Sequence, residues 1–279
     1  MCLGLNIGLV SLAQTTEVKL DERVEPEDLE LKEPKILPDS RLYFMKEWSR
    51  GIQSFFTFGR LKKTELEQKF ASERLMELKK LVEEGKVNPK VLEKATEKYE
   101  KSLEKIKALA ERIKEKAGED ENVSKFLDKF TKHQLLHQRI LQKLEEQVPE
   151  EVFQKIKEAR EKHLEKFGEI MTKLEDRTEK LRERLEKQME NIEGSKFKNF
   201  KNLEILKELE EKIPEQAKEA IRQAQENALK KLQGDLEKMA TTDQERFKEY
   251  IEKISGDKEK QLEILENLKL PLREKINAK

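Results

Sequence analysis

Apolar residues recur at every third or fourth position along most of this chain, and charged residues fill the positions between them. This spacing predicts amphipathic α-helices, because residues three and four apart lie on one face of a helix. The pattern stops at Gly59, Gly85, Gly118 and Gly194, which predicts successive helix ends. Long helices joined by short turns pack against their neighbours. We therefore expect an all-α fold: an elongated multi-helix bundle of long antiparallel helical hairpins with coiled-coil-like packing.

The second half of the chain contains an internal repeat. Ile140 begins the sequence ILQKLEEQVPEE and Ile205 begins ILKELEEKIPEQ, a constant offset of 65 residues that also aligns Pro149 with Pro214. The shared proline and apolar register predict a duplicated helix–Pro–helix unit, with the proline at the first position of each second helix. After Pro149 the apolar pattern continues to Gly194. That length predicts a single helix of roughly 65 Å.

Aromatic side chains are concentrated near the start of the helical pattern. Nearly half of those in the chain, including its only Trp, lie between residues 43 and 70. Aromatic residues bury the most area per side chain, so this segment predicts a compact structural nucleus. An aromatic groove for a ligand is the functional alternative. The predicted nucleus comprises Tyr43, Phe44, Trp48, Phe55, Phe56 and Phe70.

The N-terminal segments differ from the helical body. Residues 1–13 are uncharged and end in Ser-Leu-Ala, which resembles a secretory signal peptide with a truncated start; an unstructured apolar tip is the alternative. Residues 14–40 contain nine acidic and four basic residues with three prolines, which predicts an extended, solvated linker. The remaining chain divides into an aromatic-rich helical region at 41–118, a first long hairpin at 119–194, and a second hairpin with short C-terminal helices at 195–279.

Composition excludes several classes of partner. Charged residues make up 42% of the chain, with 59 basic and 59 acidic side chains, so the formal net charge is zero. A neutral chain has no overall charge with which to attract nucleic acid or an anionic membrane surface. A single Cys excludes an intramolecular disulfide and a cysteine-built zinc site. Hydrophobic residues reach only 35%, which predicts helices that each bury a narrow stripe rather than one thick core.

The three histidines are the candidate metal ligands. His133 and His137 are four residues apart on one helical face, a spacing that can bind zinc, and His163 could join them across a hairpin. The metalloprotease motif requires Glu after the first His, whereas this chain has Gln134. Solvated histidines on a helix surface are the alternative. The chain contains no nucleophile elbow and no Gly-rich phosphate loop, so we expect no enzymatic activity, no cofactor and no small-molecule substrate.

The segment from Pro34 to Phe58 resembles the opening of an uncharacterised prokaryotic family of secreted or surface domains of unknown function. The resemblance rests on the ILPDS sequence at 36–40, on the Trp-containing helix, and on the FFTF sequence at 55–58. It extends to Leu81 through an E-L-x-x-K-F-A-x-x-R-L-x-E pattern, and it departs from the family at Arg41, where Pro is usual. It implies export but assigns no catalytic or binding residues. The matching single residues are Tyr43, Lys46, Trp48, Lys69, Phe70, Arg74 and Glu77.

Together these observations predict an exported, non-enzymatic helical protein with a structural or protein-interaction role at the cell surface or in the periplasm. If residues 1–13 are not a signal, the protein would be cytoplasmic. We expect a protein partner or self-association, and the N-terminus would place the protein near a membrane or cell wall. The alternatives are a periplasmic chaperone that binds unfolded chains on an exposed apolar face, and a metal-binding protein that uses His133, His137 and His163.

Overall fold

The computed structural model describes residues 23–268, and these residues form helices and connecting turns without any strand. The predicted all-α helical bundle is therefore confirmed. None of these helices combines the length and apolar composition needed to span a lipid bilayer. The elements are the 3-10 helix η1 (Pro26–Leu29) and the α-helices α1 (Tyr43–Phe56), α2 (Arg60–Glu83), α3 (Pro89–Ala110), α4 (Glu121–Gln147), α5 (Glu150–Leu174), α6 (Thr178–Asn191), α7 (Lys198–Lys212), α8 (Glu215–Glu237), α9 (Thr241–Lys253) and α10 (Lys258–Asn267).

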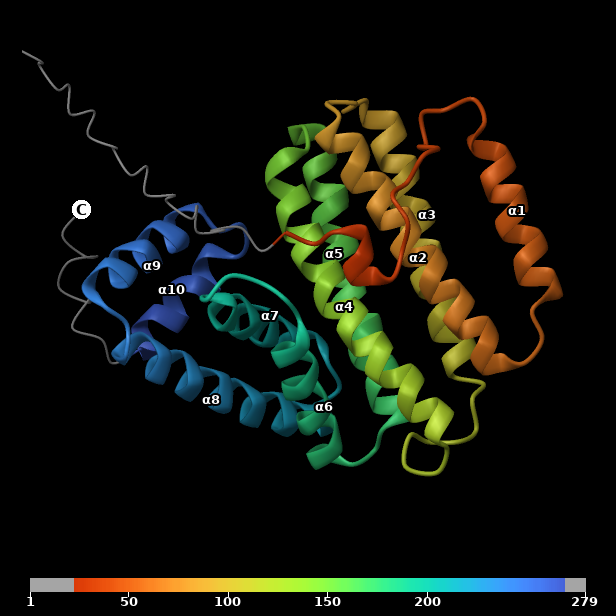
Figure 1. Cartoon of the computed structure of the whole chain (residues 1–279). Helices are drawn as coiled ribbons and strands as arrows, with labels where there is room; N and C mark the ends of the chain where they lie inside the picture. The colour runs from red at the N-terminus through yellow and green to blue at the C-terminus, as the bar shows by residue number, and fades with distance from the viewer. Residues whose placement is uncertain (1–22, 269–279) are drawn as a thin grey trace, which may run out of the picture.

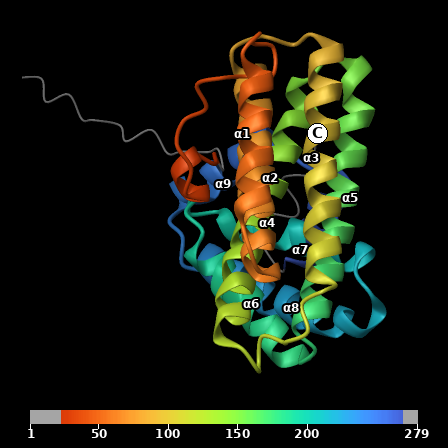
Figure 2. The same cartoon turned by 90° about the vertical axis from the view of Figure 1, so that its right-hand side faces the viewer.

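Helices α2 to α5 form a four-helix arrangement in the middle of the molecule (Figure 1). α2 packs against α3 and α4, and α5 packs against the other sides of α3 and α4, so the four helices close around one core. α4 has more than half of its residues buried, because α6 also packs against it. Helix α1 lies at the outer edge of this group (Figure 1) and packs mainly on α2. Figure 2, which views the molecule from this side, shows α1 in front of α2.

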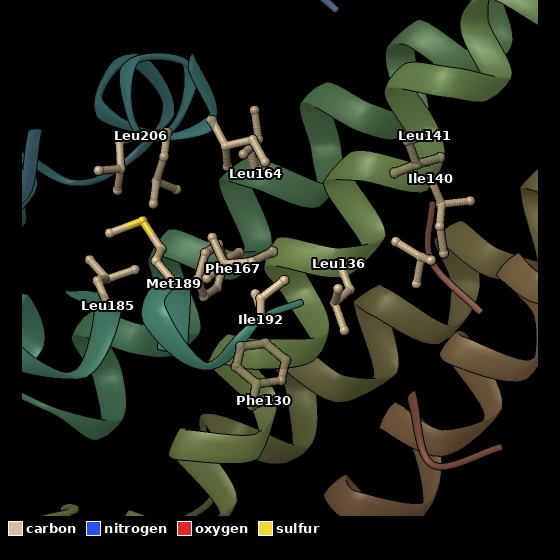
Figure 3. Close-up of a cluster of buried hydrophobic side chains, with 14 of the residues drawn as sticks. Phe130, Leu136, Ile140, Leu141, Leu164, Phe167, Leu185, Met189, Ile192 and Leu206 are labelled. Atoms are coloured by element: carbon tan, nitrogen blue, oxygen red, sulfur yellow. The ribbon is translucent and has the colours of Figure 1, made fainter. Parts of the chain in front are cut away.

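Helices α6 to α10 form a second group beside α4 and α5 (Figure 1). α7 and α8 form a hairpin, with α6 packed on α8 and α10 packed on α7. The hydrophobic core is continuous from one group to the other. Figure 3 shows part of this core, with buried side chains that extend from α6 and α7 across α5 to α4. They include Phe130, Leu136, Ile140 and Leu141 from α4, Leu164 and Phe167 from α5, Leu185 and Met189 from α6, and Leu206 from α7.

The prediction of one 65 Å helix after Pro149 is wrong, because the chain breaks between α5 and α6. Glu175 adopts extended backbone angles and is buried. The Leu174 carbonyl accepts a hydrogen bond from the Ala117 amide (2.8 Å), and the Glu175 carboxylate lies 3.6 Å from the Arg184 guanidinium. In a continuous helix the Leu174 carbonyl would accept a hydrogen bond from the amide four residues later. Here it accepts one from Ala117 instead, so the helix ends at this point. The break lets α6 pack against both α4 and α8.

The prediction of an extended, solvated linker is also wrong for its described part, residues 23–40. Val24, Leu29 and Leu37 in this segment are buried and belong to the core. The acidic side chains between them pair with lysines of the bundle: Glu30 lies 2.6 Å from Lys129, and Glu33 likewise pairs with Lys80 of α2. An alternation of apolar and acidic residues therefore anchors this segment on α2 and α4. The predicted signal peptide, residues 1–13, lies outside the described residues.

The two copies of the repeat have closely similar turns. Pro149 (φ −59°, ψ 151°) and Pro214 (φ −57°, ψ 144°) each occupy the position before the second helix begins, one residue earlier than predicted. Proline suits this extended position, since its φ is already fixed near these values. The side chains that hydrogen bond between the two helices of each copy also occupy equivalent positions, 65 residues apart. Arg160 donates to Glu145 in the first hairpin (2.5 Å), and Gln225 donates to Glu210 in the second (2.9 Å).

Candidate functional site

Helix α1 exposes the apolar side of its surface. Its aromatic face consists of Phe44, Met45, Trp48, Ile52, Phe55 and Phe56, with Leu42 and Phe58 just outside the helix ends. These eight side chains are between 38% and 77% exposed, and within residues 23–268 only Leu262 is comparable. With aromatic side chains of about 150–250 Å² each, the five aromatic residues of this set expose roughly 700 Å². A typical monomer exposes a largest apolar patch of about 300–600 Å².

The predicted structural nucleus is therefore wrong for four of its six residues. Phe44, Trp48, Phe55 and Phe56 are 66–74% exposed and do not join the core. Tyr43 and Phe70 are buried, but Tyr43 lies on the opposite side of α1 from the aromatic face. The physical reason is that α1 packs on α2 through its charged side, so the aromatic spacing marks the outer surface of the helix.

The inner side of α1 is held by hydrogen bonds and ion pairs centred on Glu77 of α2, which is fully buried. The Tyr43 hydroxyl donates to Glu77 Oε2 (2.6 Å), and the Arg50 guanidinium donates to Glu77 Oε1 (2.5 Å). Lys46 Nζ lies 2.6 Å from the same carboxylate. Arg50 also donates to Glu73 Oε2 (2.9 Å). Three side chains of α1 thus converge on one buried carboxylate.

A second group of charges ties α1 to α2 and α3. Glu47 Oε2 lies 3.1 Å from Arg74 of α2 and 3.6 Å from Lys98 of α3. Lys98 Nζ also lies over the ring of Tyr43, 4.3 Å from its centroid. Arg74 in turn hydrogen bonds the Ser102 hydroxyl of α3. The orientation of α1 is therefore fixed by contacts to both neighbouring helices.

The pKa shifts at the interface between α1 and α2 favour the charged forms of Arg50 and Glu47 and the neutral form of Tyr43. Burial would lower the pKa of Arg50, but the Glu77 carboxylate outweighs it and raises that pKa above the ordinary value. Burial would raise the pKa of Glu47, but Arg74 and Arg50 hold it below its usual range. Burial and the Glu77 carboxylate together raise the pKa of the Tyr43 hydroxyl. At neutral pH Arg50 and Glu47 are therefore charged, while Tyr43 is neutral and its hydroxyl can donate to Glu77.

Two grooves flank α1. One, of about 580 Å³, lies between α1 and α3 and includes Phe44 together with Arg41, Lys90, Lys94 and Lys98, against a single carboxylate from Glu47. The other, of about 760 Å³, lies between α1 and the segment that precedes it, and it contains both lysines and glutamates. Helix α1 is consequently a ridge with its aromatic face outermost.

The predicted metal ligands are buried side chains rather than solvated ones. His133, His137 and His163 are at most 2% exposed. The Ser72 hydroxyl of α2 lies 2.9 Å from His137 Nε2 and 3.4 Å from His133 Nδ1. The hydroxyl of Tyr99 on α3 lies 3.3 Å from His137 Nδ1. Both nitrogens of the central histidine are therefore engaged by hydroxyl groups.

His163 on α5 approaches this group but does not complete a metal site. Its ring centroid lies 5.7 Å from that of His137, and its Nδ1 accepts a hydrogen bond from Gln138 (2.5 Å). No group of three or more His, Cys, Asp or Glu side chains within residues 23–268 is placed to hold a metal ion. Burial lowers the pKa of His133 and of His163 to about 3, and it lowers that of His137 as well. The three rings serve as neutral polar members of the core.

Comparison with known proteins identifies the family. A family model described as a domain of unknown function, DUF5667, matches residues 35–275. The chain belongs to this family, as its resemblance to a domain-of-unknown-function family predicted. Comparisons with curated proteins and with solved structures gave no match.

Proposed function

We propose that this member of the DUF5667 family is a non-enzymatic helical protein with a structural or interaction role, and that it attaches to its partner through the aromatic face of α1. The observation that supports the proposal most strongly is the orientation of α1. Five aromatic side chains are exposed while Tyr43, Glu47 and Arg50 are held against the bundle. Exposed apolar surface of this extent is typical of interaction sites.

The proposal places this role outside the cytoplasm, at the cell surface or in the periplasm. Its support is the uncharged sequence of residues 1–13 and the family resemblance of residues 34–81. The absence of enzymatic activity is part of the same proposal, and it rests on the lack of catalytic motifs in the sequence.

Fractionation of the native cell envelope tests the attachment. We expect the wild-type chain to remain with the envelope fraction and a Phe55→Ser/Phe56→Ser variant to be released from it. Both side chains are largely exposed, so their replacement leaves the bundle intact. Leu262→Ser is the matched control, because it removes an exposed hydrophobic side chain from α10. If the double variant and the wild type fractionate alike, the aromatic face is not the attachment surface.

A chaperone that binds unfolded chains is the second candidate, because the exposed apolar area exceeds what a typical monomer displays. In that case the wild-type chain would suppress the aggregation of a thermally unfolding client protein, and Phe55→Ser/Phe56→Ser would not. The ridge shape of α1 favours attachment over this role, since a cradle for an unfolded chain requires a concave surface. A broad set of misfolded clients recovered from the envelope would favour the chaperone.

A further inference from the structure

We propose that the aromatic face of α1 binds the interfacial region of an anionic lipid bilayer, with the helix lying in the plane of the membrane surface. The inference rests on the proposed function and names the partner: lipid with negatively charged headgroups. Helix α1 has 14 residues, so at 1.5 Å per residue it is about 21 Å long and too short to cross a bilayer. Its geometry suits a helix that lies on the surface.

The side chains of the aromatic face are those that partition into a membrane interface. Trp48, Phe44, Phe55 and Phe56 lie on one side of α1, and Phe58 extends the surface beyond its end. Interfacial helices bury Trp, Phe and Leu between the headgroups and the acyl chains, and their affinity grows with the apolar area buried. Because the polar side of α1 is already held by Glu77 and Arg74, the whole protein would be attached rigidly through this helix.

The charge around α1 selects an anionic surface. Although the total charge of the chain is zero, the basic side chains that flank α1 give a local excess of positive charge. Lys46 and Arg50, on the inner side of α1, are paired with Glu77 and do not contribute to this excess. Arg41 lies at one end of α1, while Arg60, Lys62 and Lys63 follow its other end at the start of α2. Within the described part of the chain, Arg41, Lys62 and Lys63 form no ion pair with a carboxylate, whereas Lys46 and Lys105 nearby do. Basic side chains near a membrane surface are attracted to its anionic lipids.

The same charges disfavour a second copy of the chain as the occupant. A two-fold symmetric dimer places the same surface patch of both subunits together. Both ends of α1 carry basic side chains, Arg41 at one and Lys62 and Lys63 at the other. Pairing the aromatic faces of two copies would therefore bring like charges together in either relative direction of the helices. The ridge shape of α1 points the same way, because two convex ridges bury less surface than a ridge pressed into a deformable bilayer interface.

Trp48 provides a direct test, because it is the only Trp in the chain and 72% of its surface is exposed. The full chain is titrated with vesicles of phosphatidylcholine alone and with vesicles that also contain phosphatidylglycerol, and the Trp48 emission spectrum and co-sedimentation are recorded. We expect the emission to shift to shorter wavelength, and the protein to sediment, with the anionic vesicles. Increasing the salt concentration should weaken this binding, since it screens charges at the surface.

Three variants make the test specific to α1. Phe55→Ser/Phe56→Ser should lower the affinity for anionic vesicles by about tenfold or more, because affinity scales with apolar area. Lys62→Glu/Lys63→Glu should lower affinity for anionic vesicles and leave any weak association with neutral vesicles unchanged. Leu262→Ser, the control on α10, should bind as the wild type does. Circular dichroism of each variant confirms that the helical fold is retained.

Other outcomes overturn the proposal. No shift of the Trp48 emission with anionic vesicles, or an equal shift with neutral ones, excludes anionic lipid as the partner. A shift that depends on protein concentration without vesicles identifies a second copy as the occupant. In each case the role of the aromatic face in attachment is judged separately by envelope fractionation. If Phe55→Ser/Phe56→Ser is released from the envelope although vesicles do not bind the wild type, the proposed function holds and the partner is a protein.

Discussion

The three buried histidines should make the stability of this protein fall steeply in mild acid. In the folded state His133 and His163 have pKa values of about 3 because burial disfavours the charged ring. In the unfolded chain an exposed histidine has a pKa of about 6.5. Between pH 3 and 6.5 the unfolded state therefore binds more protons, so stability decreases as the pH falls. From pH 7.5 to pH 5 the loss is about 2 kcal/mol for each of these two residues.

The local geometry explains why the folded state resists protonation. Gln138 Nε2 donates to both His163 Nδ1 (2.5 Å) and the carbonyl of Arg160 (3.2 Å), so Nδ1 must act as an acceptor. A protonated ring has no acceptor nitrogen, so it would lose this hydrogen bond and face a donor instead. His137 is also buried and its pKa is lowered, which adds to the loss in the same direction.

Urea unfolding followed by circular dichroism at pH 7.5, 6.5, 5.5 and 5 measures this effect. His163→Asn removes one titrating ring and keeps an acceptor, so the difference in unfolding free energy between pH 7.5 and 5 should shrink by about 2 kcal/mol. Phe167→Leu is the control, because its ring lies 6.4 Å from that of His163 and its loss weakens packing without removing a titrating group. Comparing each variant with the wild type cancels the contribution of the carboxylates. An unchanged pH dependence in His163→Asn would refute the argument.

Three further substitutions test the packing of the helices, each by urea unfolding at neutral pH. Glu77→Gln should destabilise the protein by about 1–3 kcal/mol, because Lys46 and Arg50 lose their shared buried carboxylate. Arg50 keeps its ion pair with Glu73, which limits the loss. Amide hydrogen exchange should show that α1 opens more readily than the rest of the protein. Gly168→Ala should cost about 1–3 kcal/mol, since an added Cβ would clash with a methyl carbon of Ile213 and lie 3.0 Å from its Cβ. Gly234→Ala should instead stabilise by up to about 1 kcal/mol, because its helix has open space at that position.

Helix positions were predictable because glycines, prolines and apolar spacing act locally. Asn88 caps α3 through its side chain, and Pro89 follows at the first helical position, as their sequence indicates. The turns at Pro149 and Pro214 were likewise evident from the repeat. The break after Leu174 was not, because it depends on a hydrogen bond from Ala117, more than fifty residues away in the chain. Local propensity permits a helix there, and tertiary contacts override it.

The breadth of the core was also underestimated, since composition alone does not reveal how polar residues are used. α4 buries His137, Gln138 and Arg139 alongside its apolar residues. Across the junction with α7, Arg160 lies between Glu145 (2.5 Å) and Glu208 (2.6 Å), so even charged side chains fill the interior. A chain with 35% hydrophobic residues can enclose a continuous core when its buried polar groups bond one another.

The orientation of α1 shows why its site could not be recognised from periodicity. An amphipathic pattern identifies two opposite sides of a helix but does not say which of them contacts the protein. The usual assumption places the apolar side inward, which would have buried Trp48 and Phe55. The polar residues that decide the matter, Tyr43, Lys46 and Glu77, belong to the family motif, and they meet only because α1 folds back on α2. A buried carboxylate that gathers a hydroxyl and two cations from one side of a helix fixes that side inward, and the aromatic face is then available to a partner.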